Sequence, residues 1–204
     1  MNSALTPWMY SKIKKGDIRS MRKVLQLLSI VVVGIAVALM LISPEMVLIF
    51  GSPKYREAVY VIPPVAASVF FIFIYNILSM PQFYYEKTQF LMAASMAAAG
   101  ANVVLNFIFI RLFGYIAAGY TTLACYMLYS VGHYIVSKRI LVNEGIQENL
   151  MNPGFLLACS VFLIGASIIC NLIFPYRILR YAILLASAGL VFWKKELLLK
   201  TMAD

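Results

Sequence analysis

Charged side chains are scarce in this sequence. Asp, Glu, Lys and Arg make up 12% of the 204 residues, whereas a soluble globular domain carries about 25%. Hydrophobic residues make up 63% of the chain and the mean hydropathy is +0.87. A soluble core could not hide this much apolar surface, so the composition predicts an integral membrane protein. Segments of about 10 residues that alternate polar and apolar side chains, as in a membrane β-barrel, are also lacking. We therefore expect an all-α polytopic protein.

The groups that metal binding and catalysis need are few. Cys125, Cys159 and Cys170 lie in apolar segments without paired spacing, which favours buried side chains over a disulfide or a metal set. The single histidine, His133, is expected to be a hydrogen-bonding residue near the cytoplasmic surface rather than a proton carrier. The sequence has no HExxH motif, glycine-rich phosphate loop or nucleophile with a placed base. We expect no enzymatic activity, cofactor or metal.

Six apolar segments are candidates for membrane spans, because about 20 apolar residues cross a bilayer. They are residues 24–43, 61–80, 90–110, 115–136, 155–174 and 178–193. Pro44 and Pro81 follow the first two segments and are expected to end those helices. The sixth segment is short and carries Arg180, whose charged group is expected to reach the membrane surface along its aliphatic stem.

The basic residues stand at the ends of these segments. The net charge of +9 raises the possibility of nucleic-acid binding. Basic residues at the ends of apolar segments instead determine how a protein is oriented in the membrane, so no nucleic-acid partner is expected. With six spans, twelve of the 17 Lys and Arg fall on the side of the termini and five on the other. The positive-inside rule then predicts that both termini are cytoplasmic.

This topology divides the chain into four parts. Residues 1–23 would be a cytoplasmic basic segment, 24–136 a four-helix unit, 137–152 a cytoplasmic loop, and 153–204 a terminal helix pair with a cytoplasmic tail. Ile13, Ile18 and Met21 are expected to lie on the membrane surface, with the nearby basic side chains facing lipid headgroups.

The polar residues of the spans are the candidates for a substrate path. Asn102 and Asn106 are four residues apart and therefore share one helix face, as expected for a face that points at protein or at a polar cavity. Asn76 and Arg111 are the other candidates. The alternative is that the amides pair across a helix interface and that Arg111 contacts lipid headgroups. The interiors of the first five spans hold no charged residue, which argues against a proton-coupling carboxylate there.

Three basic residues are candidates for a cytoplasmic mouth, where they could attract a lipid pyrophosphate: Arg22, Lys23 and Lys87. The alternative interpretation is that these residues only determine the orientation of the protein in the membrane.

Four stretches of the sequence resemble one family in the same order. They are NSALTPWMYSKIKKGD, SPEMVLIFGSPKYREAVYVIPPVA, QFYYEKTQ and ANVVLNFIFIRLFGYIAAGYTTLACY. Together they cover residues 2–134 and resemble the C-terminal half of polysaccharide flippases, the O-antigen and capsule translocases. These belong to the superfamily that includes multidrug extruders and the lipid II flippase.

The resemblance implies part of the C-terminal lobe of a two-lobe transporter in the bacterial inner membrane. Such a transporter moves undecaprenyl-diphosphate-linked oligosaccharide to the periplasmic leaflet by alternating access. Its partners would be the lipid-linked oligosaccharide, membrane lipids and the polysaccharide polymerase machinery. The N-terminal lobe and two further helices have no counterpart here, so the chain is expected to be a fragment, the product of a mis-started reading frame, or half of a split protein. Arg111 stands where the family has a proline.

Two other functions remain open at this stage. One is a multidrug or other cation-coupled exporter of the same superfamily. The other is a membrane scaffold that does not transport.

Overall fold

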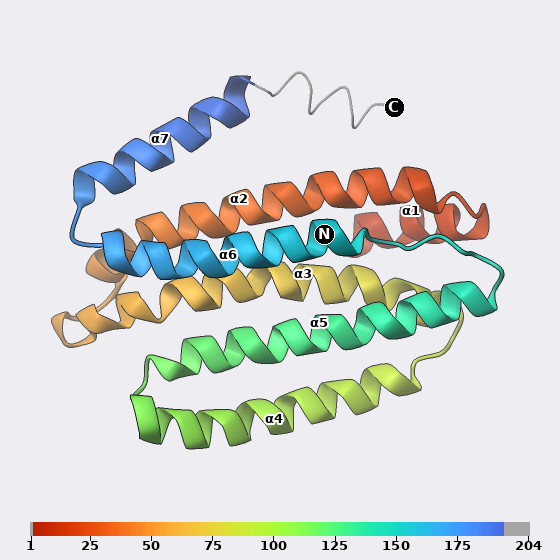
Figure 1. Cartoon of the computed structure of the whole chain (residues 1–204), viewed down its shortest axis with the longest axis horizontal. Helices are drawn as coiled ribbons and strands as arrows, with labels where there is room; N and C mark the ends of the chain where they lie inside the picture. The colour runs from red at the N-terminus through yellow and green to blue at the C-terminus, as the bar shows by residue number, and fades with distance from the viewer. Residues whose placement is uncertain (1, 194–204) are drawn as a thin grey trace.

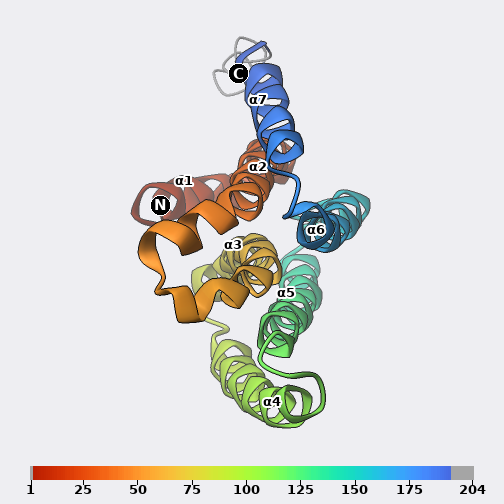
Figure 2. The ribbon, with the colours of Figure 1, turned by 90° about the vertical axis from the view of Figure 1, so that its left-hand side faces the viewer.

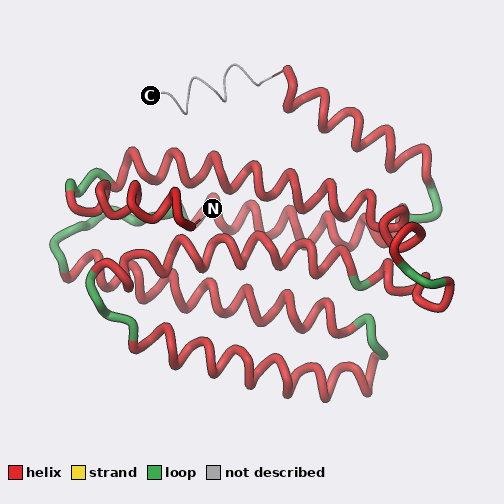
Figure 3. The backbone as a smooth tube through the Cα atoms, turned by 180° about the vertical axis from the view of Figure 1, so that it is seen from behind, coloured by secondary structure: helices red, strands yellow, loops and turns green. Residues whose placement is uncertain are grey.

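The computed structural model describes residues 2–193 and contains seven α-helices and one 3-10 helix. They are α1 (Asn2–Lys14), α2 (Ile18–Phe50), η1 (Pro53–Tyr60), α3 (Ile62–Tyr84), α4 (Gln89–Phe113), α5 (Ala117–Asn143), α6 (Pro153–Ile173) and α7 (Arg177–Trp193). The described part of the chain has no strand (Figure 3), so the expected all-α class is confirmed. The predicted C-terminal tail lies outside the described residues.

Helices α2 to α6 run up and down side by side (Figure 1). Helix α3 is central and packs against α2, α5 and α6, whereas α4 packs on α5 at one edge and α7 lies beside α2 at the other (Figure 2). One end of the bundle holds α1 and the α3–α4 and α5–α6 connections. We call it the α1 end. The opposite end holds η1 and the α4–α5 and α6–α7 connections, and we call it the η1 end.

Helices α3 and α5 approach each other closely at Gly119. A Cβ atom there would lie 2.8 Å from Pro64 Cγ and 2.9 Å from the carbonyl oxygen of Val61. Only glycine therefore allows this approach, which brings Phe70 and Ile74 of α3 into the buried core. In contrast, α4 has no buried residue, and its small-residue stripe from Ala93 to Ala101 is not enclosed within this chain.

Four helices are long and apolar enough to cross a membrane: α2, α3, α4 and α6. This supports the predicted membrane protein, but it does not confirm six spans. The described part of α7 has 17 residues, and α5 is interrupted by polar side chains that include His133, Lys138 and Arg139. Gly114, with a φ of 78°, follows the last residue of α4 and lies between the predicted spans 90–110 and 115–136.

The predicted helix ends at Pro44 and Pro81 are wrong, because α2 and α3 continue through both prolines. A proline inside a helix leaves the carbonyl four residues earlier without its usual N–H partner. The hydroxyl of Ser43 replaces that donor at Met40, with its Oγ 2.8 Å from the carbonyl oxygen. The helix can therefore continue in apolar surroundings without an unpaired backbone group at this point.

Three apolar side chains of the first residues do not face lipid as predicted. Ile13, Ile18 and Met21 are buried in the core, because α1 folds back onto α2 and α3. Asp17 begins α2, where its carboxylate accepts hydrogen bonds from the backbone N–H of Ser20 and from Lys12 Nζ at 2.6 Å. The bond from Lys12 holds the pKa of Asp17 below its usual value.

The prediction that the charged group of Arg180 extends to water is also wrong. Its side chain is 1% exposed and forms an ion pair with Glu45 of α2, with Nη2 2.7 Å from Oε1. A partner carboxylate on the neighbouring helix satisfies the guanidinium, so the side chain does not need to extend to water. This pair attaches α7 to α2.

Candidate functional site

A cavity with polar lining lies between α3, α4 and α5, near the middle of α3 and α4. Its volume is about 450 Å³. The lining combines hydroxyls, one amide and three tyrosines with small apolar residues. Its members are Tyr75, Ser95, Ala98, Ala99, Asn102, Val103, Thr122, Cys125, Tyr126 and Tyr129. We call this the polar cavity.

Amides and hydroxyls form a hydrogen-bonded ladder along one side of the polar cavity. Asn106 Nδ2 donates to Asn102 Oδ1 at 2.9 Å, and Asn102 Nδ2 lies 3.5 Å from Thr122 Oγ1. Thr121 Oγ1 donates to Asn106 Oδ1 at 2.5 Å. The ladder thus joins α4 to α5. The two amides therefore share one face and pair across a helix interface, as in the alternative interpretation, and Asn102 also lines the polar cavity.

Three tyrosines form another part of the wall, and two of them, Tyr126 and Tyr129, share a face of α5 with Thr122. Tyr75 of α3 stacks on Tyr126 of α5, with the ring centroids 6.3 Å apart, and lies 4.7 Å from the ring of Tyr129. The Tyr129 hydroxyl is 2.7 Å from Ser95 Oγ of α4. Tyrosine offers a flat apolar face together with a hydroxyl that can donate and accept hydrogen bonds. The wall therefore suits a ligand with both apolar faces and hydroxyl groups.

The residues that line the polar cavity carry no formal charge. Asparagine, serine, threonine and tyrosine donate and accept neutral hydrogen bonds. The arrangement is thus suited to uncharged polar groups such as sugar hydroxyls, and less to a cation or a phosphate. Among residues 2–193 no group of three or more His, Cys, Asp and Glu could hold a metal ion.

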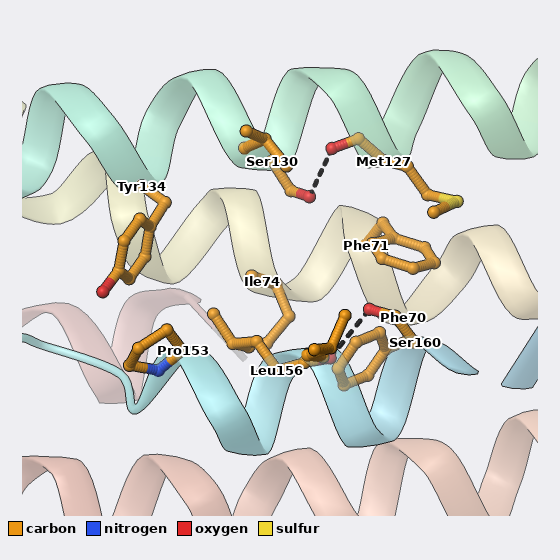
Figure 4. Close-up of a pocket in the computed structure, with 11 residues that line it drawn as sticks. Phe70, Phe71, Ile74, Met127, Ser130, Tyr134, Pro153, Leu156 and Ser160 are labelled. Atoms are coloured by element: carbon orange, nitrogen blue, oxygen red, sulfur yellow. Dashed lines mark hydrogen bonds between the residues drawn. The ribbon is translucent and has the colours of Figure 1, made fainter. Parts of the chain in front are cut away.

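A second cavity, of about 270 Å³, lies between α3, α5 and α6 and is mainly apolar (Figure 4). Phe70, Phe71 and Ile74 form its α3 side. Its serines offer little to a ligand, because Ser130 donates to the carbonyl oxygen of Met127 and Ser160 to that of Leu156 within their own helices. The cavity therefore presents mainly hydrocarbon.

The predicted substrate-path residues occupy different places. Asn102 lines the polar cavity, and Asn106 supports it through the ladder. Asn76 lies outside the lining and donates to the carbonyl oxygen of Ile72 in its own helix at 2.7 Å. Arg111 is exposed at the end of α4, where its guanidinium lies 3.8 Å from the centre of the Phe107 ring. The structure thus does not bring the four residues together.

The predicted cytoplasmic-mouth residues lie at the α1 end, and two of them are ion-paired. Arg22 bonds Glu148 at 2.7 Å, and Lys87 bonds Glu144 at 2.6 Å. Both acids belong to the region where α5 ends and leads to α6. Lys23 is exposed. The carboxylates offset the charge that Arg22 and Lys87 would offer to a pyrophosphate.

The tyrosines were missed by the sequence reasoning, although a signal exists. Thr122, Tyr126, Tyr129 and His133 follow each other at spacings of four, three and four residues, which places them on one face of α5. His133 is fully buried within the protein, and it forms a hydrogen bond as predicted. Its Nδ1 accepts a hydrogen bond from Gln82 Nε2 at 2.7 Å. An amide nitrogen can only donate, so the imidazole proton lies on Nε2.

Comparison with known proteins gives no relative from which to assign a function. No family model, no curated protein and no solved structure matches this chain.

Proposed function

We propose that this chain is part of a transporter that moves lipid-linked oligosaccharide, carried on undecaprenyl diphosphate, across the bacterial inner membrane. It would form part of the C-terminal lobe and would work with membrane lipids and the polysaccharide polymerase machinery. The resemblance of residues 2–134 to polysaccharide flippases is the first support. The proposed role is transport, without catalysis or a cofactor.

The polar cavity is the observation that carries the proposal. A glycan that crosses a bilayer needs hydrogen-bonding partners at mid-depth, because hydrocarbon offers none. Asn102 and Tyr129 lie near the middle of α4 and α5, and they line one cavity together with Thr122. The flat faces of Tyr75 and Tyr126 would pack on sugar rings, as amphipathic aromatic side chains can.

The proposed orientation has both termini in the cytoplasm and six membrane crossings. Helix α5 lies side by side with α3 and α4 between the two ends of the bundle, which favours a crossing by α5 as well (Figure 1). The ends differ in charge, which supports a cytoplasmic α1 end. The α1 end carries Lys12, Lys14, Lys15, Arg19, Arg22, Lys23, Lys87, Lys138 and Arg139, whereas the η1 end carries Lys54, Arg56, Arg111, Arg177 and Arg180.

The test uses cells whose gene for this transporter is deleted and then restored with variants. Asn102→Leu removes the amide that lines the polar cavity, and cells should accumulate undecaprenyl-linked repeat units and lose surface polysaccharide. The matched control is Asn171→Leu on α6, an amide outside the cavity that donates to the Tyr120 hydroxyl at 3.1 Å. Normal surface polysaccharide in the deletion strain would refute the proposal.

A multidrug exporter of the same superfamily is the second candidate. The mainly apolar cavity of Figure 4 favours it, because apolar and aromatic walls suit drug-like molecules. Drug sensitivity of the deletion strain, together with intact surface polysaccharide, would select this function. Loss of a stable membrane complex without any transport defect would instead select a scaffold.

A further inference from the structure

Three arginines gather around Pro44 at the η1 end, and one of them is already engaged. Arg180 donates from Nη1 and Nη2 to the two carboxylate oxygens of Glu45, at 2.8 and 2.7 Å, and from Nη1 to the carbonyl oxygen of Leu41. The Tyr181 hydroxyl also donates to Glu45, at 2.9 Å. Glu45 is thus occupied by α7 residues other than Arg177.

The other two arginines have no acidic partner in the described structure. Arg56 lies on η1 and Arg177 begins α7, and both are exposed. The structure contains five ion pairs between described residues, and neither arginine belongs to one. Two uncompensated guanidinium groups therefore remain where the apolar helices end.

Both arginines line adjacent cavities with apolar walls. One cavity, of about 340 Å³, is bounded by Arg56 and Arg177, and the other, of about 380 Å³, by Arg177 and Arg180. Pro44 and Leu48 belong to both. The remaining lining is Val47 and Val59 in the first cavity and Glu45, Phe174, Pro175 and Tyr181 in the second.

A buried donor in the second cavity lacks a partner. Arg180 is 1% exposed, and its Nε has no hydrogen-bond acceptor. Buried polar atoms are rarely left unpaired in native proteins, so such an atom calls for an explanation. The Nε atom is enclosed by protein, so the exposed guanidinium groups of Arg56 and Arg177 are the donors that a ligand can reach.

We propose that the cavities around Arg56, Arg177 and Arg180, which we call the arginine corner, bind the phosphate group of an anionic membrane phospholipid. Guanidinium groups match phosphate oxygens through paired hydrogen bonds. The apolar floor of Pro44 and Leu48 suits the glycerol and the first acyl carbons. The site lies where the apolar helices end, which is the depth of lipid headgroups.

This inference does not rest on the substrate proposed above, because the arginine corner is separate from the polar cavity. Free inorganic phosphate is the other source of the same chemistry. It has no group to cover Leu48, Val47 and Phe174, so the apolar walls favour the lipid.

The test measures lipid binding to the purified full chain in a mild detergent by native mass spectrometry. Phosphatidylglycerol is titrated against the wild type and against Arg56→Gln/Arg177→Gln. Loss of hydrogen bonds from charged groups should weaken binding by about tenfold or more. Lys54→Gln is the matched control, because this exposed residue of η1 carries the same charge but lines neither cavity. Its effect should stay within about twofold.

Three results would overturn the proposal. They are unchanged binding in the double variant, an equal loss in Lys54→Gln, and displacement of phosphatidylglycerol by inorganic phosphate. The first would show that Arg56 and Arg177 do not contribute to binding, the second that they act only through general charge, and the third that the ligand is a free anion. A wild type that prefers phosphatidylglycerol over phosphatidylcholine, with this preference lost in the double variant, would support it. Circular dichroism of each variant checks the fold.

Discussion

Removing Glu45 should destabilise the protein more than removing Arg180. The two partners of this ion pair are buried unequally, because the side chain of Arg180 is 1% exposed and that of Glu45 is 28% exposed. Breaking a buried pair by removing one partner costs about 3–5 kcal/mol, since an uncompensated charge stays buried. Glu45→Met leaves the guanidinium in that state, so the upper part of this range is expected.

Arg180→Met leaves a carboxylate that can still reach water. The expected cost is therefore smaller, about 1–3 kcal/mol, and it includes the lost hydrogen bond to the carbonyl oxygen of Leu41. The double variant with methionine at both positions removes both charges. Replacing a buried ion pair by hydrophobic residues of similar volume is often neutral or stabilising. The double variant should thus be more stable than Glu45→Met alone.

The assay is a double-mutant cycle measured by unfolding in sodium dodecyl sulfate, followed by circular dichroism of the detergent-solubilised protein. Glu148→Met is the control, because it breaks a more exposed cluster with Arg19 and Arg22 and should cost less than about 1 kcal/mol for each pair. The reasoning fails if Arg180→Met costs as much as Glu45→Met, or if the two single effects simply add in the double variant.

Three further predictions concern the α3–α5 and α4–α5 contacts and use the same unfolding assay or spectroscopy. Gly119→Ala should cost about 1–3 kcal/mol, because its Cβ would overlap α3. The matched variant Gly100→Ala has open space around its Cβ and should stabilise the protein by about 0.5–1 kcal/mol. Equal changes in stability for the two alanine variants would refute the packing argument. Thr121→Val should lower the free energy of unfolding by about 0.6 kcal/mol, the average for hydrogen bonds between helices in membranes. An unchanged free energy would indicate that the ladder does not contribute to stability. The chain has one histidine, so nitrogen-15 spectra can report on His133 directly. They should place the imidazole proton on Nε2, because Gln82 donates a hydrogen bond to Nδ1. A proton on Nδ1 would contradict this hydrogen bond.

The positions of the helices could be predicted from the sequence because apolar length is a local property. Each of the six apolar segments corresponds to one helix from α2 to α7. The pairing of Asn102 with Asn106 was also accessible, since a spacing of four residues determines the shared face of a helix. Their partners Thr121 and Thr122 on α5 were not, because the rotation of one helix against another depends on packing along both.

The prolines show where a local rule fails. Proline usually ends a helix because it removes one hydrogen bond and crowds the preceding turn. At Pro44 a neighbouring side chain supplies the missing bond, from Ser43 to Met40. The pattern Ser-Pro is visible in the sequence, but it is also typical of turns. Only the apolar surroundings on both sides decide in favour of a continuous helix.

Charge was the least predictable feature, because the partners are far apart in the sequence. Arg180 and Glu45 are separated by 135 residues, and Arg22 and Glu148 by 126. A single arginine in an apolar segment can extend to the membrane surface or find a carboxylate, and the sequence does not distinguish the two outcomes. The net charge of +9 therefore gives the excess of basic over acidic residues, but not where the unpaired basic residues lie in the fold. In the folded chain the carboxylates bind particular bases, and Arg56 and Arg177 are left facing two cavities at the η1 end. The distribution of this surplus, rather than its size, is what makes the arginine corner a candidate lipid site.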